Sequence, residues 1–130
     1  MNVDDLKLIR TLKFGILLLA FLGSPLGLAQ GLVQEPDFEQ MTQAIWLTEG
    51  GLKTKHPFGV LSVPCSSFTE CRQITLNSLR NSWERYQKAK TQMPFDEFFQ
   101  KRWCPVGAEN DPQGLNRNWL LNFRYFMEKL

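Results

Sequence analysis

One glutamate in this sequence stands where a carboxyl group could hold a proton for catalysis. Glu49 ends the apolar run "AIWLTE", and Gly50 and Gly51 follow it directly. It comes one helical turn after Ile45, so it belongs to the face of a helix that apolar residues form. Partial burial and the negative end of the helix dipole both favour the protonated carboxyl. We therefore predict a raised pKa for Glu49. The residues alone leave two interpretations of its role: a proton donor at the mouth of a cleft, or an ordinary solvated residue at a helix end.

Other catalytic or metal-binding chemistry has little support in the sequence. His56 is the only histidine and no two cysteines form a CxxC pair, so we predict neither a metal site nor a cofactor. A nucleophilic thiol would need a nearby base, which the sequence does not supply. Lys55 and His56 occur in a polar loop, where solvated side chains are the simpler interpretation.

The chain contains three cysteines, Cys65, Cys71 and Cys104, which an exported protein would carry into an oxidising compartment. Cys65 and Cys71 are close enough in sequence to close one loop. Cys104 could instead pair with either of them, and the sequence does not decide between these connectivities.

The helix that carries Glu49 is predicted to begin near Pro36 and Asp37, because proline and acidic residues suit a first helical turn. The glycines after Glu49 would end it. The segment "PFGVLSV", residues 57–63, follows the polar loop. Its β-branched and aromatic residues predict either one strand of a small hairpin or an extended wall of a cleft. The shared face of the helix consists of Phe38, Met41, Thr42, Ile45 and Glu49.

Three further helices are predicted downstream. The first runs from about Thr69 to Lys90, the second is short and begins after Pro94, and the third spans Leu115 to Leu130. The fold class is therefore mainly α, a small helical domain with at most a short β-hairpin. The stripes predicted to face the core are Leu76, Leu79, Trp83 and Tyr86, then Phe95, Phe98, Phe99 and Trp103, then Trp119, Phe123, Phe126 and Leu130.

The first 29 residues have the pattern of a secretory signal peptide. Lys7, Arg10 and Lys13 precede the apolar run "FGILLLAFL", and small residues up to Ala29 suit a cleavage site. The run is short for a membrane span, which needs roughly 20 apolar residues, although an uncleaved anchor is the alternative. We predict a signal peptide at residues 1–29, a domain at residues 30–130, and a secreted or periplasmic protein.

The charge of the predicted domain is close to neutral. Of the 15 basic and 13 acidic residues, three and two fall within residues 1–29, which leaves the domain a net charge of +1. So weak a charge does not favour nucleic acid as a partner. We also expect a monomer that does not associate with a membrane after signal cleavage.

Two motifs resemble the lysozyme-like superfamily, which includes the lytic transglycosylases and the goose-type lysozymes. "TEGG" is followed, ten residues after its glutamate, by "GVLSV", and in that superfamily a glutamate at a helix end is followed by a segment that lines the cleft. "RWCPVGAENDPQGLNRNWLLNF" is similar to its aromatic–Ala–Pro turn, its Asn-containing loop and its closing helix. The resemblance covers most of residues 37–126 and implies a lysozyme-like domain.

The resemblance also implies roles for individual residues. Glu49 matches the catalytic acid, and Ser62 takes the place of the glutamine that is usual in the cleft segment. Tyr86 would lie on the long helix, which borders the cleft in that superfamily. Either Asn110 or Asn116 would supply the amide of the loop. The residues implied to bind substrate are Gly59, Ser62, Tyr86 and Asn110.

By this resemblance the protein is an exported glycosidase whose partner is the glycan strand of peptidoglycan. One glutamate would act first as acid and then as base, with help from the N-acetyl group of the sugar. The alternative is a secreted glycan-binding or inhibitor module that keeps the fold without turnover. A second carboxylate would come from Asp96, Glu97, Glu109 or Asp111, and the sequence favours none of these.

Overall fold

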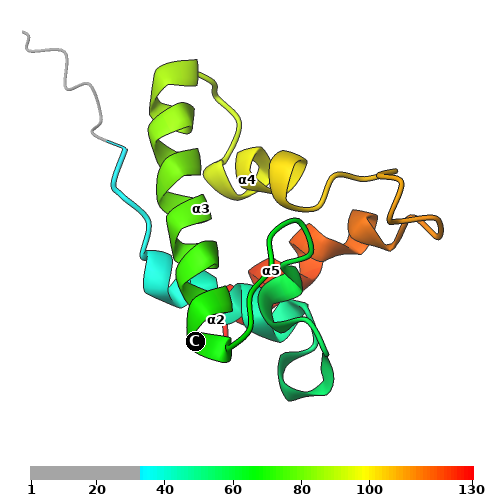
Figure 1. The fold of residues 1–130 in the computed structure, drawn as a ribbon. Helices are drawn as coiled ribbons and strands as arrows, with labels where there is room; N and C mark the ends of the chain where they lie inside the picture. Colours follow the sequence, from blue (N-terminus) through cyan, green and yellow to red (C-terminus); the bar gives the residue numbers. More distant parts are fainter. Residues whose placement is uncertain (1–32) are drawn as a thin grey trace, which may run out of the picture. The chain divides into compact units, whose positions relative to one another are not determined.

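A computed structural model describes residues 33–130, so the predicted signal peptide lies outside the described residues. Residues Glu35–Leu130 form one compact unit of four α-helices joined by short 3₁₀ turns (Figure 1). No strand occurs among residues 33–130, and the predicted mainly helical class is confirmed. The elements are α2 (Phe38–Thr48), η1 (Gly51–Lys53), η2 (Pro57–Gly59), α3 (Phe68–Ala89), α4 (Phe95–Trp103), η3 (Leu115–Asn118) and α5 (Trp119–Met127).

Helix α2 begins and ends where its sequence predicts. The Asp37 carboxylate accepts hydrogen bonds from the backbone N–H groups of Glu39 and Gln40, both at 3.0 Å, and so caps the first turn. Glu49 is the C-cap residue, and Gly50 after it is left-handed with φ of 102°. A glycine tolerates this backbone conformation without steric cost, and the helix therefore stops at Thr48.

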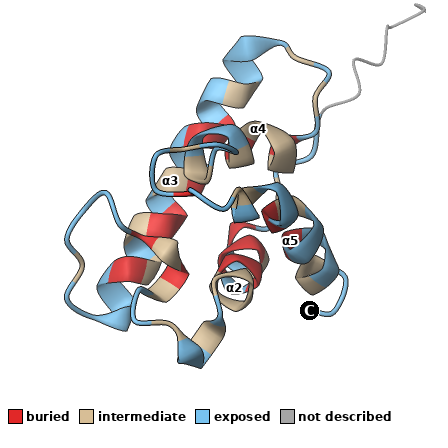
Figure 2. Ribbon diagram, turned by 90° about the vertical axis from the view of Figure 1, so that its right-hand side faces the viewer, coloured by how far each residue is buried: buried red, intermediate tan, exposed pale blue. Residues whose placement is uncertain are grey.

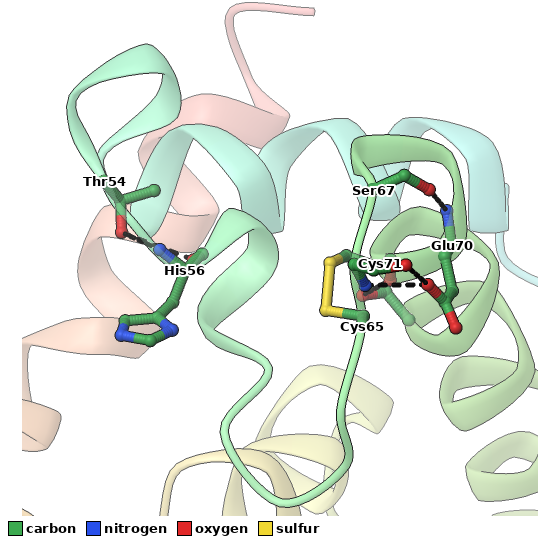
Figure 3. The surroundings of a disulfide bond; sticks show 8 residues. Thr54, His56, Cys65, Ser67, Glu70 and Cys71 are labelled. Atoms are coloured by element: carbon green, nitrogen blue, oxygen red, sulfur yellow. Dashed lines mark hydrogen bonds between the residues drawn. A yellow bond between two sulfur atoms is a disulfide. The ribbon is translucent and has the colours of Figure 1, made fainter.

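Helix α3 is held at its start by a network of capping hydrogen bonds. The Ser67 hydroxyl accepts a hydrogen bond from the Glu70 N–H at 3.2 Å, and the Glu70 carboxylate accepts two from Ser66 at 2.7 Å (Figure 3). These bonds from Ser66 lower the pKa of Glu70. The helix ends at Lys90, whose φ of 46° turns the chain out of the helix.

The core lies between the four α-helices. Helix α2 packs against α3 and α5, while α4 packs against α3 and α5, so the buried faces turn toward one another (Figure 2). Most of the predicted stripes are buried, but Leu130 is 46% exposed because α5 ends three residues earlier. The side chains with almost no exposure are Phe58, Phe99, Phe123, Ile45, Leu79, Thr42, Thr75 and Cys71.

Two predicted segments differ in the structure. The chain from Leu115 is not one helix: the Asp111 carboxylate accepts hydrogen bonds from the N–H groups of Leu115 and Asn116, and a 3₁₀ turn precedes α5. The strand alternative for residues 57–63 is wrong. Phe58 and Gly59 both have positive φ, 63° and 66°, and two such residues in succession turn the chain away from an extended path.

Cys65 and Cys71 form a disulfide, and Cys104 is a free thiol. The bond joins the segment before α3 to the first turn of that helix (Figure 3). It therefore anchors the end of the segment that follows η2. In the part of the chain that the structure describes, no helix has both the length and the apolar character needed to cross a membrane.

Reduction of the disulfide should lower the free energy of unfolding by about 2 kcal/mol, because the closed loop restricts the unfolded chain. The two cysteines are only six positions apart in the sequence, so the loss is smaller than a long loop would give. Urea unfolding with and without reductant measures it. The Cys104→Ser variant should lose the same amount on reduction; a variant that no longer responds to reductant would show that Cys104 takes part in the bond.

Candidate functional site

The carboxyl group of Glu49 is held by a tryptophan from the other end of the domain sequence. The Trp119 indole N–H donates a hydrogen bond of 2.7 Å to Glu49 Oε1. Trp119 is itself 6% exposed and stacks on Phe123 with ring centroids 5.1 Å apart. Because the indole cannot move without disturbing this packing, it fixes the position of the carboxyl group.

The second constraint on Glu49 is the backbone of Gly59. A Cβ atom built on Gly59 would lie 2.5 Å from Glu49 Cδ and 2.6 Å from Oε2, so the carboxyl rests against a position that only glycine leaves open. Phe58, which is 1% exposed, anchors the turn that brings Gly59 to this place. Glu49 is thus enclosed by elements from three parts of the chain.

Burial raises the pKa of Glu49 above its ordinary value, as the sequence predicts. The hydrogen bond from Trp119 lowers the pKa, because it stabilises the charged form, but the effect of burial is the larger. No buried side-chain oxygen in the described region lacks a partner, and Oε2 accepts no hydrogen bond there. Glu49 lines a cavity, through which a ligand can reach its side chain.

Glu49 opens onto a cleft made of two adjoining cavities. The cavity at Glu49 has a volume of about 250 Å³ and the second has about 390 Å³. They are neighbours because four residues line both: Gly59, Leu61, Trp103 and Asn110. The other residues of the first cavity include Thr54, His56, Cys104, Pro105 and Asn116.

Three of the four residues predicted to bind substrate line this cleft. Gly59 and Asn110 line both cavities, whereas Ser62 lines only the second. Residues 59–63 thus line the cleft, but they are not the extended wall that was predicted as the alternative to a strand, because Gly59 ends a 3₁₀ turn and the chain bends at Ser62 and Val63. Tyr86 lines neither cavity: its hydroxyl donates to the Met93 carbonyl at 2.8 Å and its ring packs on Trp83. We therefore leave Tyr86 out of the site.

Glu49 is the only carboxyl group that lines the two cavities within residues 33–130. Of the predicted second carboxylates, Asp96 and Glu97 bind Arg124 at 2.6 and 3.0 Å. The buried Asp111 accepts hydrogen bonds from two backbone N–H groups of η3, and Glu109 does not line the cleft. None of the four candidates is free to act on a ligand at Glu49.

The first cavity is also lined by a thiol and an imidazole, which belong to Cys104 and His56. Burial, with the nearby charges of Glu49 and Asp111, raises the pKa of the Cys104 thiol to about 12. It stays protonated near neutral pH and is no nucleophile. His56 is exposed, and its backbone N–H donates to the Thr54 hydroxyl at 3.1 Å (Figure 3). Among the described residues, no group of three His, Cys, Asp or Glu side chains could hold a metal ion.

Sequence reasoning missed several residues of the cleft. Ser78, Ser82 and Arg85 face the second cavity from α3, at the spacing of one helical face. The partnership of Trp119 with Glu49 joins residues 70 positions apart, and no local pattern marks it. The signal on α3 was available in principle, because its polar residues recur every three or four positions beside the apolar stripe.

The chain matches no protein-family model, and no curated protein or solved structure is significantly similar to it. The lysozyme-like interpretation therefore rests on the motifs of this sequence and on the geometry of its own cleft.

Gly59→Ala should destabilise the protein by about 3 kcal/mol. About 1 kcal/mol comes from the left-handed backbone, and the rest from displacing Glu49 and breaking its hydrogen bond to Trp119. Gly107→Ala is the matched control, because Gly107 has φ of 77° and open space around its Cα. Urea unfolding should show a loss of only about 1 kcal/mol there.

In a Glu49→Ala background, Gly59→Ala should cost no more than Gly107→Ala, because the displaced carboxyl is then absent. An unchanged cost in that background would mean that Glu49 does not rest on Gly59.

Glu49→Gln should stabilise the protein at neutral pH, since the wild-type carboxyl must lose its proton in a poorly solvated place. Its folded pKa is raised, so its contribution to stability is fully present below the unfolded value of about 4.5 and is lost as pH rises through the folded value. Thermal unfolding should therefore show a stability gain at pH 7 that vanishes at pH 4. Exposed Glu84→Gln controls for the charge change; a gain independent of pH would contradict the raised pKa.

Proposed function

We propose that this protein is a lysozyme-like glycosidase that cleaves the glycan strands of peptidoglycan, with Glu49 as general acid and base. One observation carries the proposal: a carboxyl group with a raised pKa accepts a hydrogen bond from Trp119 and lines the cleft. A general acid requires a carboxyl group whose pKa is raised by its surroundings and which a ligand can reach.

In the proposed first step, protonated Glu49 gives its proton to the glycosidic oxygen as the bond from that oxygen to C1 breaks. The leaving sugar departs as an alcohol, and the positive charge that develops at C1 is shared with the ring oxygen. In the second step the Glu49 carboxylate takes a proton from the incoming hydroxyl, which bonds to C1. That hydroxyl belongs to water or to the C6 position of the same sugar, and Glu49 is restored either way.

A mechanism with a single glutamate suits this cleft. Glu49 is the one carboxyl that lines the two cavities in the described region. Asp96 and Glu97 bind Arg124, Asp111 binds backbone, and Glu109 lies outside the cleft. Such a mechanism leaves charge stabilisation at C1 to the N-acetyl group of the substrate. This requirement favours N-acetylated glycans over other β-1,4 polymers.

The cleft offers groups suited to sugars beside the acid. The Trp103 ring, half-exposed and stacked on Phe99 at 5.2 Å, lines both cavities and gives a flat apolar surface for a sugar face. The Asn110 amide and the Ser62 hydroxyl lie on the exposed wall, where they can exchange hydrogen bonds with sugar hydroxyls.

The cellular setting belongs to the same proposal. A disulfide between Cys65 and Cys71 suits an oxidising compartment, and the signal-like N-terminus provides a route to it. Peptidoglycan lies outside the cytoplasmic membrane. We therefore propose that the protein is a secreted or periplasmic monomer that cleaves peptidoglycan in the cell wall.

A second candidate is a glycan-binding module without turnover. It is favoured by Ser62, which replaces a longer amide side chain and lines the second cavity but not the cavity at Glu49. The substrate contact nearest to the reacting bond would then be missing. Binding to peptidoglycan without release of soluble fragments from it would decide for this candidate.

Glu49→Gln should abolish release of soluble fragments from purified peptidoglycan, because an amide has no acidic proton to give.

Trp119→Phe keeps an aromatic ring but removes the indole N–H that stabilises the carboxylate, so it should raise the pKa of Glu49 further. Wild-type activity should fall as pH rises through the raised pKa, and in Trp119→Phe this fall should move to higher pH. Activity that survives in Glu49→Gln would remove Glu49 from the mechanism.

A further inference from the structure

The second cavity of the cleft has an uneven charge. Within residues 33–130, Arg85 and Arg102 are its only charged lining residues, and no acidic side chain lines it. Both arginines are exposed, and neither forms an ion pair with an acidic residue of the described region. This distinguishes them from Arg72 and Arg124, which bind Glu39 and the pair Asp96 and Glu97 respectively.

The two cations reach the cavity from different helices. Arg85 comes from the second half of α3, on the face that also carries Ser78 and Ser82. Arg102 comes from the last turn of α4, next to Trp103, which lines both cavities. The packing of α4 on α3 thus sets two guanidinium groups around one space beside the cavity of Glu49.

Guanidinium groups without acidic partners suit an anionic ligand. Each has five N–H donors in a planar fork that matches a carboxylate or a phosphate. Two like charges that face one cavity also repel each other, and a bound anion removes that repulsion. A neutral sugar would draw no benefit from them, since serine and asparagine already supply the donors that its hydroxyls need.

We propose that Arg85 and Arg102 form a subsite for a carboxylate carried by the glycan, so that the substrate is an acidic rather than a neutral polysaccharide. The inference rests on the proposed function for its glycan. In peptidoglycan every second sugar carries a lactyl group, which ends in a carboxylate or in a peptide stem that has its own. Fixing that sugar beside Arg85 and Arg102 would also select which of the two alternating glycosidic bonds reaches Glu49.

The test compares two tetrasaccharides by calorimetry, on Glu49→Gln protein so that neither is cleaved. One is the neutral N-acetylglucosamine tetramer, and the other alternates that sugar with N-acetylmuramic acid. The acidic tetramer should bind about tenfold more tightly. Arg85→Gln and Arg102→Gln should each weaken it about tenfold and leave the neutral tetramer within about twofold.

Matched controls are present on the same two helices. Arg80 on α3 and Lys101 on α4 are exposed and do not line the cavity, so Arg80→Gln and Lys101→Gln should leave both affinities unchanged. Equal binding of the two tetramers, or equal losses in the control variants, would overturn the acidic subsite while leaving glycan binding intact.

A different result would separate the subsite from the proposed function. If neither tetramer binds, the glycan proposal fails, and so does the assignment of the carboxylate to a glycan. Lactate and inorganic phosphate are then titrated while the side-chain Nε–Hε NMR signals are followed. Shifts of Arg85 and Arg102, but not of Arg80, would support an anion site of another kind; no shifts would overturn it.

Discussion

The structure of the cleft depends on one carboxyl group that is confined from two sides. Glu49 accepts a hydrogen bond from Trp119 and rests against the bare Cα of Gly59. The contact ties the end of α2 to the start of α5 and to η2, and it adds to the packing of α2 on both elements. The same confinement removes water from the carboxyl and raises its pKa. Local structure and acid strength at this site therefore have one physical cause.

Much of this arrangement follows from local sequence signals. Asp37 and Ser67 cap helices, Gly50 ends one, and the apolar stripe on α2 places Glu49 at its edge. These features act over a few residues, so a single sequence reveals them. The direction of the Glu49 pKa could be predicted for the same reason, because burial of a helix face is a property of that face.

The predictions that were wrong, and the contacts that were not predicted, depend on residues that are distant from one another in the sequence. Nothing near Trp119 in the sequence indicates that its indole binds Glu49. The Tyr86 hydroxyl binds the carbonyl of Met93, which lies after the end of α3, so the sequence of that helix alone does not predict the contact. The strand alternative for residues 57–63 failed because Phe58 adopts a backbone conformation that is unfavourable for an aromatic residue. Burial of the Phe58 ring compensates for this cost, and the pattern of residue types along the sequence does not show that this ring is buried.

The free thiol of Cys104 has a consequence for how long the Cys65–Cys71 disulfide lasts. Thiolates, not thiols, attack disulfides, and a pKa of about 12 leaves only about one Cys104 in 10⁵ ionised at pH 7. Shuffling of the Cys65–Cys71 disulfide and cross-linking between two chains are therefore slower than with a thiol of ordinary pKa. An odd cysteine, commonly a hazard in an oxidising medium, is here kept chemically silent by the residues that shape the cleft.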